Sequence, residues 1–277
     1  MWILVSVLTG IARNYVKLPE SELKKLLDLR RRLAPKQRGM TTKNRTRLRQ
    51  FDDPAAVQSI LHLPRRLVEE AKGRGLPDKR SAVLVEMALV IELFLMCMPR
   101  IKNVASIHLD QNLQRSRATR TGRCHLVFEP SEVKNGQHLE FDLNLLTVEL
   151  LDLYLGTYRQ FLAPARCRWL FGTRDGTSHV DECVLSNRMR TAILKRTGLT
   201  INPHLFRALG AKLYLDQNPG GYEVVRRMLG HTSLSTVISA YTGLESVSTA
   251  RHFDQTMRKL RDSSGIGKRS RQPRCAP

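Results

Sequence analysis

The stretch LGHTSLSTVISAYTG, residues 229–243, places His231 and Tyr241 ten positions apart. Both side chains can take part in transfer of a phosphoryl group. A tyrosine oxygen can attack phosphorus to give a covalent intermediate, and a histidine can accept the phenol proton, whose ordinary pKa is about 10. The alternative is that Tyr241 is only an aromatic residue that packs a helix into a core.

A second pair of candidate residues, His204 and Arg207, occurs in NPHLFRALG. Pro203 favours a helix start, and a spacing of three places both side chains on one face of that helix. The amide groups at a helix N-terminus suit a phosphate. The His-x-x-Arg spacing alone is a weak signal, because most such pairs are solvated helix faces.

Two further cations complete a set for phosphodiester chemistry. Arg100 ends a long apolar segment, and Lys134 lies at the tip of a predicted hairpin. Two arginines can clamp the nonbridging oxygens through planar donors that stay charged. A lysine ammonium can give a proton to the leaving alkoxide. Together these residue types predict phosphoryl transfer without a metal.

The elements that must position these residues are mainly helical. The apolar run over 80–100 predicts a buried helix, and Pro64 is expected to kink or divide the helix that starts near Asp53. Residues 124–142 predict a hairpin whose turn holds Asn135-Gly136. The expected fold class is mainly α with a small antiparallel β-sheet. Further helices are predicted over 19–34, 145–162, 180–197, 203–217, 221–230, 233–241 and 245–260.

Charge is the unusual feature of the composition. The 277 residues hold 46 Lys and Arg against 25 Asp and Glu, a net charge of +21, which favours nucleic acid as the partner over a membrane or an acidic protein. The five cysteines are scattered without a CxxC pair, so neither a zinc site nor a disulfide framework is predicted, and a cytoplasmic location is expected. The apolar start of the chain is too short to span a bilayer.

The sequence resembles the tyrosine recombinases, also called phage-type integrases, over about residues 55–260. The family hallmark is Arg, Lys, His-x-x-Arg, His and Tyr in chain order, with Leu-Gly-His before the tyrosine. The resemblance implies a site-specific recombinase of mobile genetic elements that cleaves and rejoins double-stranded DNA through a 3'-phosphotyrosine, as a homotetramer and without a cofactor. It implies that the catalytic residues are Arg100, Lys134, His204, Arg207, His231 and the nucleophile Tyr241.

The expected domains follow from the same comparison. Residues 51–262 would form the catalytic domain, and 263–277 a basic, disordered tail. Residues 1–50 resemble the last helix and linker of the family's core-binding domain, with 35–50 as a basic linker. Next to a DNA-cleaving domain, backbone contacts are expected from Lys43, Arg45, Arg47 and Arg49.

Two other functions stay open from the sequence. One is a decayed or incomplete recombinase that only binds DNA, which the short N-terminal part favours. The other is a type IB topoisomerase-like enzyme with the same nucleophile and no synapsis, which the Leu-Gly-His pattern disfavours. The family also suggests that the helix over 245–260 docks on a neighbouring protomer, with Phe253, Met257 and Leu260 as anchors. The spacing does not decide whether Tyr241 acts in cis or in trans.

Overall fold

The computed structural model describes residues 1–33, 40–115, 123–241 and 246–263, so the tail over 264–277 lies outside it. The chain divides into two compact units, Met1–Thr41 and the part from Thr42 onward. The first unit is a pair of helices, α1 (Trp2–Ile11) and α2 (Glu20–Leu33), which pack against each other. The helix predicted over 19–34 is therefore confirmed as α2.

The second unit opens with α3 (Thr42–Arg49), where a linker was expected over 35–50. That expectation is wrong for residues 42–49. The segment has few apolar residues, but Leu48 is only 1% exposed and α3 packs against α10 (Pro203–Gln217). The side-chain amide of Gln50 also makes two hydrogen bonds with the backbone of Thr200. Its Nε2 donates to the Thr200 oxygen at 2.9 Å, and its Oε1 accepts from the Thr200 amide at 3.0 Å. Contacts with residues far along the chain stabilise a helix that its own composition does not predict.

The next helices include the buried helix at the core of this unit. α4 (Pro54–Leu61) and α5 (Leu63–Lys72) are separated where Pro64 was expected to divide them. α5 packs along α6 (Lys79–Met96), the helix predicted from the apolar run, and most of the side chains of α6 are buried. α7 (Ile101–Ala105) follows directly after Arg100.

The small sheet has three antiparallel strands in the order β1-β2-β3. The predicted hairpin is confirmed as β2 (Cys124–Phe128) and β3 (Leu139–Leu143), with Leu126 opposite Phe141. β1 (Leu113–Arg115) pairs with β2 and was not predicted as a strand at this position, because three residues are too few to show an alternating pattern.

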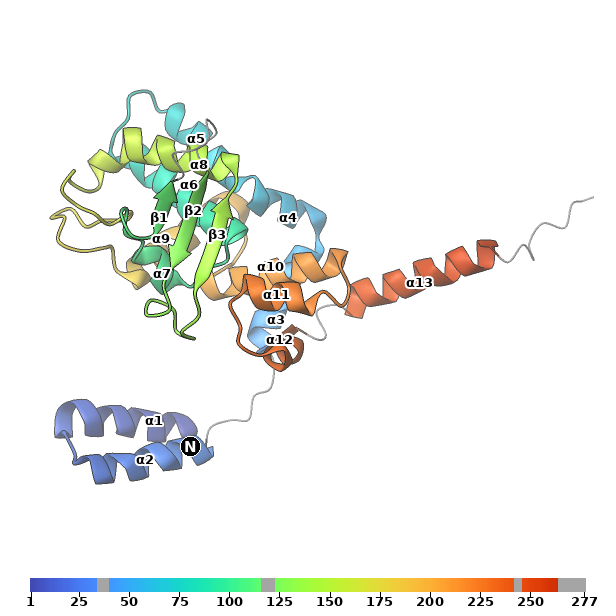
Figure 1. The fold of residues 1–277 in the computed structure, drawn as a ribbon, viewed down its shortest axis with the longest axis horizontal. Helices are drawn as coiled ribbons and strands as arrows, with labels where there is room; N and C mark the ends of the chain where they lie inside the picture. The colour runs from blue at the N-terminus through green and yellow to red at the C-terminus, as the bar shows by residue number, and fades with distance from the viewer. Residues whose placement is uncertain (34–39, 116–122, 242–245, 264–277) are drawn as a thin grey trace, which may run out of the picture. The chain divides into compact units, whose positions relative to one another are not determined.

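After the sheet the second unit is helical. α8 (Leu145–Leu153) continues through a π-helical turn over Tyr154–Tyr158, and the remaining helices are close to their predicted ranges. The expected fold class, mainly α with a small antiparallel sheet, is confirmed. Figure 1 shows α10, α11 (Tyr222–Met228) and α12 (Leu234–Tyr241) gathered to one side of the sheet. Within the described ranges, no helix is long and apolar enough to cross a membrane. Helix α9 (Glu182–Thr197) precedes α10 in the sequence, and α13 (Ser246–Ser263) follows α12.

Candidate active site

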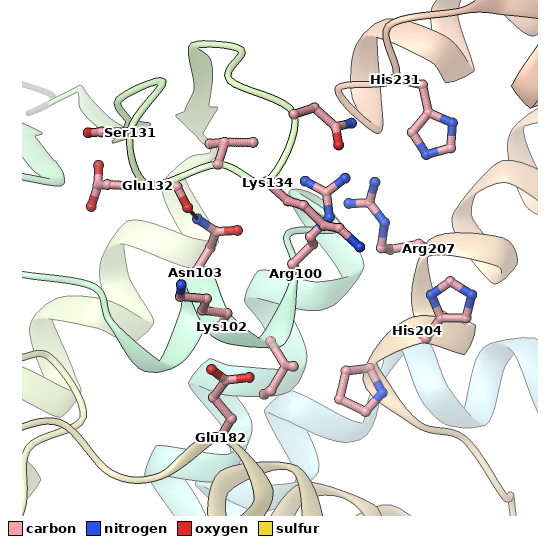
Figure 2. A pocket seen from close by; sticks show the side chains of 14 residues that line it. Arg100, Lys102, Asn103, Ser131, Glu132, Lys134, Glu182, His204, Arg207 and His231 are labelled. Carbon is pink, nitrogen blue, oxygen red and sulfur yellow. Dashed lines mark hydrogen bonds between the residues drawn. The ribbon is translucent and has the colours of Figure 1, made fainter. Parts of the chain in front are cut away.

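One cavity of about 840 Å³ brings together side chains from distant parts of the second unit. Five of the six predicted site residues line it. Figure 2 shows their side chains converging from the start of α7, the β2–β3 turn, α10 and the turn after α11. The five are Arg100, Lys134, His204, Arg207 and His231.

The start of α10 positions two of these residues. The Asn202 side chain caps the helix by accepting a hydrogen bond from the amide of Leu205 at 2.8 Å, and Pro203 occupies the first turn, as predicted. His204 and Arg207 then lie one turn apart and both face the cavity. The local sequence alone therefore sets the relative placement of this pair.

Arg207 connects the segments that carry two other site residues. Its guanidinium donates to the backbone oxygen of Met98 and to that of Leu229, both at 2.5 Å. Met98 precedes Arg100 by two residues, and Leu229 precedes His231 by two. Arg207 is 6% exposed, and burial together with the positive charge of Arg100 lowers its pKa to about 10. The side chain therefore stays cationic at neutral pH.

Arg100 presents a buried donor to the cavity without a protein partner. Its Nη1 atom is shielded from solvent and has no hydrogen-bond partner among the described residues. Buried polar groups are nearly always paired, so an unpaired guanidinium nitrogen beside a cavity indicates a site for an anion. The backbone before it is also unusual, because Met98 has a φ of 49° and its sulfur lies 1.9 Å from where a Cβ on Gly210 would stand. Gly210 thus makes room for the turn that delivers Arg100.

The two histidines of the site are held in the neutral form. Burial is the largest cause, and the charges of Arg207 and Arg100 add to it, so the pKa of His204 is lowered and that of His231 falls to about 4. The Nδ1 atom of His231 is a second buried atom without a hydrogen-bond partner in the described part of the chain. A neutral imidazole can accept a proton at pH 7, which a protonated one cannot.

The turn between β2 and β3 places Lys134 at the cavity. Glu132 fixes this turn, because its carboxylate accepts from the Asn112 side chain at 3.0 Å and from the amide of Glu129 at 2.8 Å. The backbone oxygen of Glu132 accepts from the Asn103 side chain at 3.1 Å (Figure 2). Lys134 extends from this turn toward Arg100 and Arg207 (Figure 2).

Tyr241 lies close to this group but does not line the cavity. It ends α12 and is 6% exposed. Burial raises the pKa of its phenol, and the positive charge of Arg207 opposes that rise. The structure therefore places Tyr241 within electrostatic reach of Arg207, as a buried residue that is not among those lining the cavity.

A family model matches the part of the chain that carries these residues. The model described as "Phage integrase family" matches residues 65–246, a span that contains all six predicted site residues. This chain belongs to the phage integrase family. A search among curated proteins found no match.

Several solved structures of recombinases resemble this integrase-family chain. A XerH site-specific recombinase bound to difH substrate in a pre-cleavage complex is 19% identical, with 65% of this chain and 48% of that chain covered and a TM-score of 0.49. A XerA recombinase is 15% identical over 91% and 81% of the two chains, with a TM-score of 0.44. A lambda integrase bound to DNA is 16% identical over 84% and 92%, with a TM-score of 0.39. This chain spans about half the length of the XerH chain that it matches.

The basic residues expected to contact DNA lie on α3 and do not line the cavity. Lys43, Arg45 and Arg49 are exposed, and Arg47 is partly exposed. On this helix Lys43 and Arg47 share one face, and Arg45 and Arg49 share another, so the four cations do not form the single continuous row that an extended linker would present. Contacts between this helix and DNA stay a prediction.

Sequence reasoning missed the residues that hold the site together. Asn103, Asn112 and Glu132 fix the Lys134 turn, and Arg226 donates from Nη1 to the backbone oxygen of His231 at 2.9 Å. Each of these side chains is polar and has no sequence feature that distinguishes it from a surface residue. Their partners lie at distant positions or across a turn, and only the folded structure shows them.

Proposed function

We propose that this chain is a site-specific DNA recombinase that cleaves and rejoins DNA strands through a 3'-phosphotyrosine intermediate. The observation that carries the proposal is the unpaired, buried Nη1 atom of Arg100, which faces a cavity shared with Arg207, Lys134 and two neutral histidines. A cavity with these side chains suits the scissile phosphate of DNA. The family and the net charge of +21 support the same partner.

The proposed reaction exchanges one oxygen–phosphorus bond for another. The Tyr241 oxygen attacks the phosphorus atom, a neutral histidine accepts the phenol proton, and the bond to the 5' oxygen of the next nucleotide breaks. Lys134 gives its ammonium proton to that oxygen, while Arg100 and Arg207 hold the nonbridging oxygens. Attack by a DNA 5' hydroxyl on the phosphotyrosine reverses these steps, so no ATP is needed.

The buried position of Tyr241 adds one requirement to this mechanism. Its side chain must leave the packed position at the end of α12 to reach a phosphate in the cavity. We infer that DNA binding drives this movement. The same burial also favours the second candidate function, a DNA-binding protein without cleavage activity, in which Tyr241 never leaves the core.

The experiment that tests the proposal captures a covalent adduct. The protein is incubated with a library of nicked duplexes that carry a random central segment, so that a cleaved strand loses its short end and cannot rejoin. Adducts that survive SDS are isolated with the protein and their DNA is sequenced. We expect adducts with one enriched sequence for the wild type and none for Tyr241→Phe, which still binds DNA. Binding by both proteins with no adduct from either would favour the DNA-binding alternative.

Assembly of four protomers on two DNA sites is part of the proposal. Phe253, Met257 and Leu260 are exposed on α13, as an anchor for a neighbouring protomer requires. Mass measurement on the recovered duplex should show a tetramer with two DNA molecules. Phe253→Asp should reduce the complex to smaller species, and unchanged assembly would remove α13 as the contact.

A further inference from the structure

Hydrogen bonds hold the turn that carries Lys134 on both its β2 side and its β3 side. On the β2 side, Glu132 binds Asn112 and Asn103, as described above. On the β3 side, Asn135 donates from Nδ2 to the backbone oxygen of Gly230 at 3.0 Å, across 95 residues of sequence. Gly230 immediately precedes His231. The residue after Lys134 is therefore bonded to the residue before His231.

Packing at the same place supports this bond. Gly230 has a φ of 59°, and the Cδ2 atom of Leu139 lies 2.6 Å from where a Cβ on Gly230 would stand. Leu139 begins β3, so the turn after α11 lies directly against the hairpin that carries Lys134. The amide orientation of Asn135 follows from its partner, because a carbonyl oxygen can only accept.

We propose that Asn135 is a positioning residue, which holds the Lys134 turn against the His231 turn so that both side chains meet the same scissile phosphate. The inference rests on the proposed function, in which Lys134 protonates the leaving 5' oxygen. Without the Asn135 bond, the turn keeps its fold through Glu132 but loses its register with His231. Asn135 also lines the cavity, but in this proposal it acts through the position of Lys134.

A purely local role for Asn135 has a distinct consequence. The amide of Gly136 donates to the backbone oxygen of Val133 at 2.8 Å, so Asn135 is also the third residue of a tight turn. Aspartate suits such a turn as well as asparagine does, but it cannot donate a hydrogen bond. Asn135→Asp therefore keeps the turn preference and removes the bond to Gly230. A residue that serves only the turn would tolerate this change.

The test compares two leaving groups. The duplex recovered by adduct capture is synthesised with either oxygen or sulfur at the 5' bridging position of the scissile phosphate. A thiolate leaves without a proton, so cleavage of the sulfur substrate does not need a general acid. We expect Asn135→Ala and Asn135→Asp to cleave the oxygen substrate about tenfold more slowly than the wild type in a single turnover, and the sulfur substrate at the wild-type rate.

A double-mutant cycle with Lys134→Ala gives the second readout. In that background Asn135→Ala should cause no further loss, because the group that Asn135 positions is already absent. Equal losses on both substrates, an additive loss with Lys134→Ala, or wild-type cleavage by Asn135→Asp would each overturn the inference. Failure of the wild type to cleave either substrate would instead overturn the proposed function.

Discussion

Arg207 and Leu229 are joined by a hydrogen bond of 2.5 Å from the guanidinium to the backbone oxygen. The bond links the second turn of α10 to the residue two positions before His231. Arg207 therefore has two tasks, because the same side chain that faces the cavity also fixes the turn that delivers a histidine to it. Its second bond, to Met98, does the same for the segment of Arg100.

Arg207→Lys should separate the effect of the positive charge from that of the guanidinium's hydrogen-bond geometry. Lysine keeps the positive charge but has no planar fork to reach the Met98 and Leu229 oxygens together. We expect cleavage to fall by about 10²- to 10³-fold, with a loss of about 2 kcal/mol in the free energy of unfolding. Arg227→Lys, on an exposed side chain of α11, is the matched control and should change neither quantity. A cleavage rate within a few-fold of the wild type for Arg207→Lys would show that the hydrogen bonds to Met98 and Leu229 do not position the site.

Acid should destabilise the second unit through His231. Its pKa of about 4 in the folded state lies below the ordinary value of 6.5, so the unfolded chain binds more protons between these values. The stability contributed by neutral His231 is complete above pH 6.5 and is lost as the pH falls toward 4. The loss should be about 2 kcal/mol, after allowance for partial exposure.

Urea unfolding at several pH values measures this dependence on His231. His231→Gln should flatten the slope of stability between pH 6.5 and 4, whereas the exposed His62→Gln should leave it unchanged. An identical slope in His231→Gln and the wild type would show that other groups cause the acid sensitivity.

The contribution of Glu86 to the free energy of unfolding should depend on pH in the opposite direction. It lies in α6, is 1% exposed and pairs with Arg188 at 3.3 Å. Burial outweighs this pairing and raises its pKa to about 7, so stability is lost as the pH rises from 4.5 through 7. Glu86→Gln should therefore raise the free energy of unfolding by about 1 kcal/mol at pH 8 and by nothing at pH 5. Destabilisation at pH 8 would mean that the ion pair outweighs the cost of burial, and Glu69→Gln on the surface is the control.

Gly230 and Gly198 provide a matched pair of substitutions. Both have a positive φ, 59° and 70°, but only Gly230 has a neighbour against the missing Cβ, the side chain of Leu139. Gly198→Ala should cost about 1 kcal/mol from backbone strain alone. Gly230→Ala should cost about 3 kcal/mol, because strain and overpacking add. Thermal unfolding of the two variants measures the difference, and equal costs would show that Leu139 moves aside freely.

The sequence predicts those parts of the site that depend on local rules. Pro203 and the spacing of His204 and Arg207 define one helix start, and Asn135-Gly136 marks the hairpin. The role of Asn135 depends on a bond across 95 residues, which no local pattern indicates. The helix α3 was missed for the same reason, since Leu48 stabilises it through distant contacts. The burial of Tyr241 depends on packing around α12, so the sequence identified the residue and not its position.

The proposed mechanism requires that Tyr241 becomes covalently joined to DNA. The most direct measurement is mass spectrometry of the peptide that carries DNA after adduct capture and nuclease digestion. We expect a nucleotide attached through its 3' phosphate to Tyr241. Attachment to another residue, such as Tyr214, or no attachment despite tight binding of DNA would contradict it.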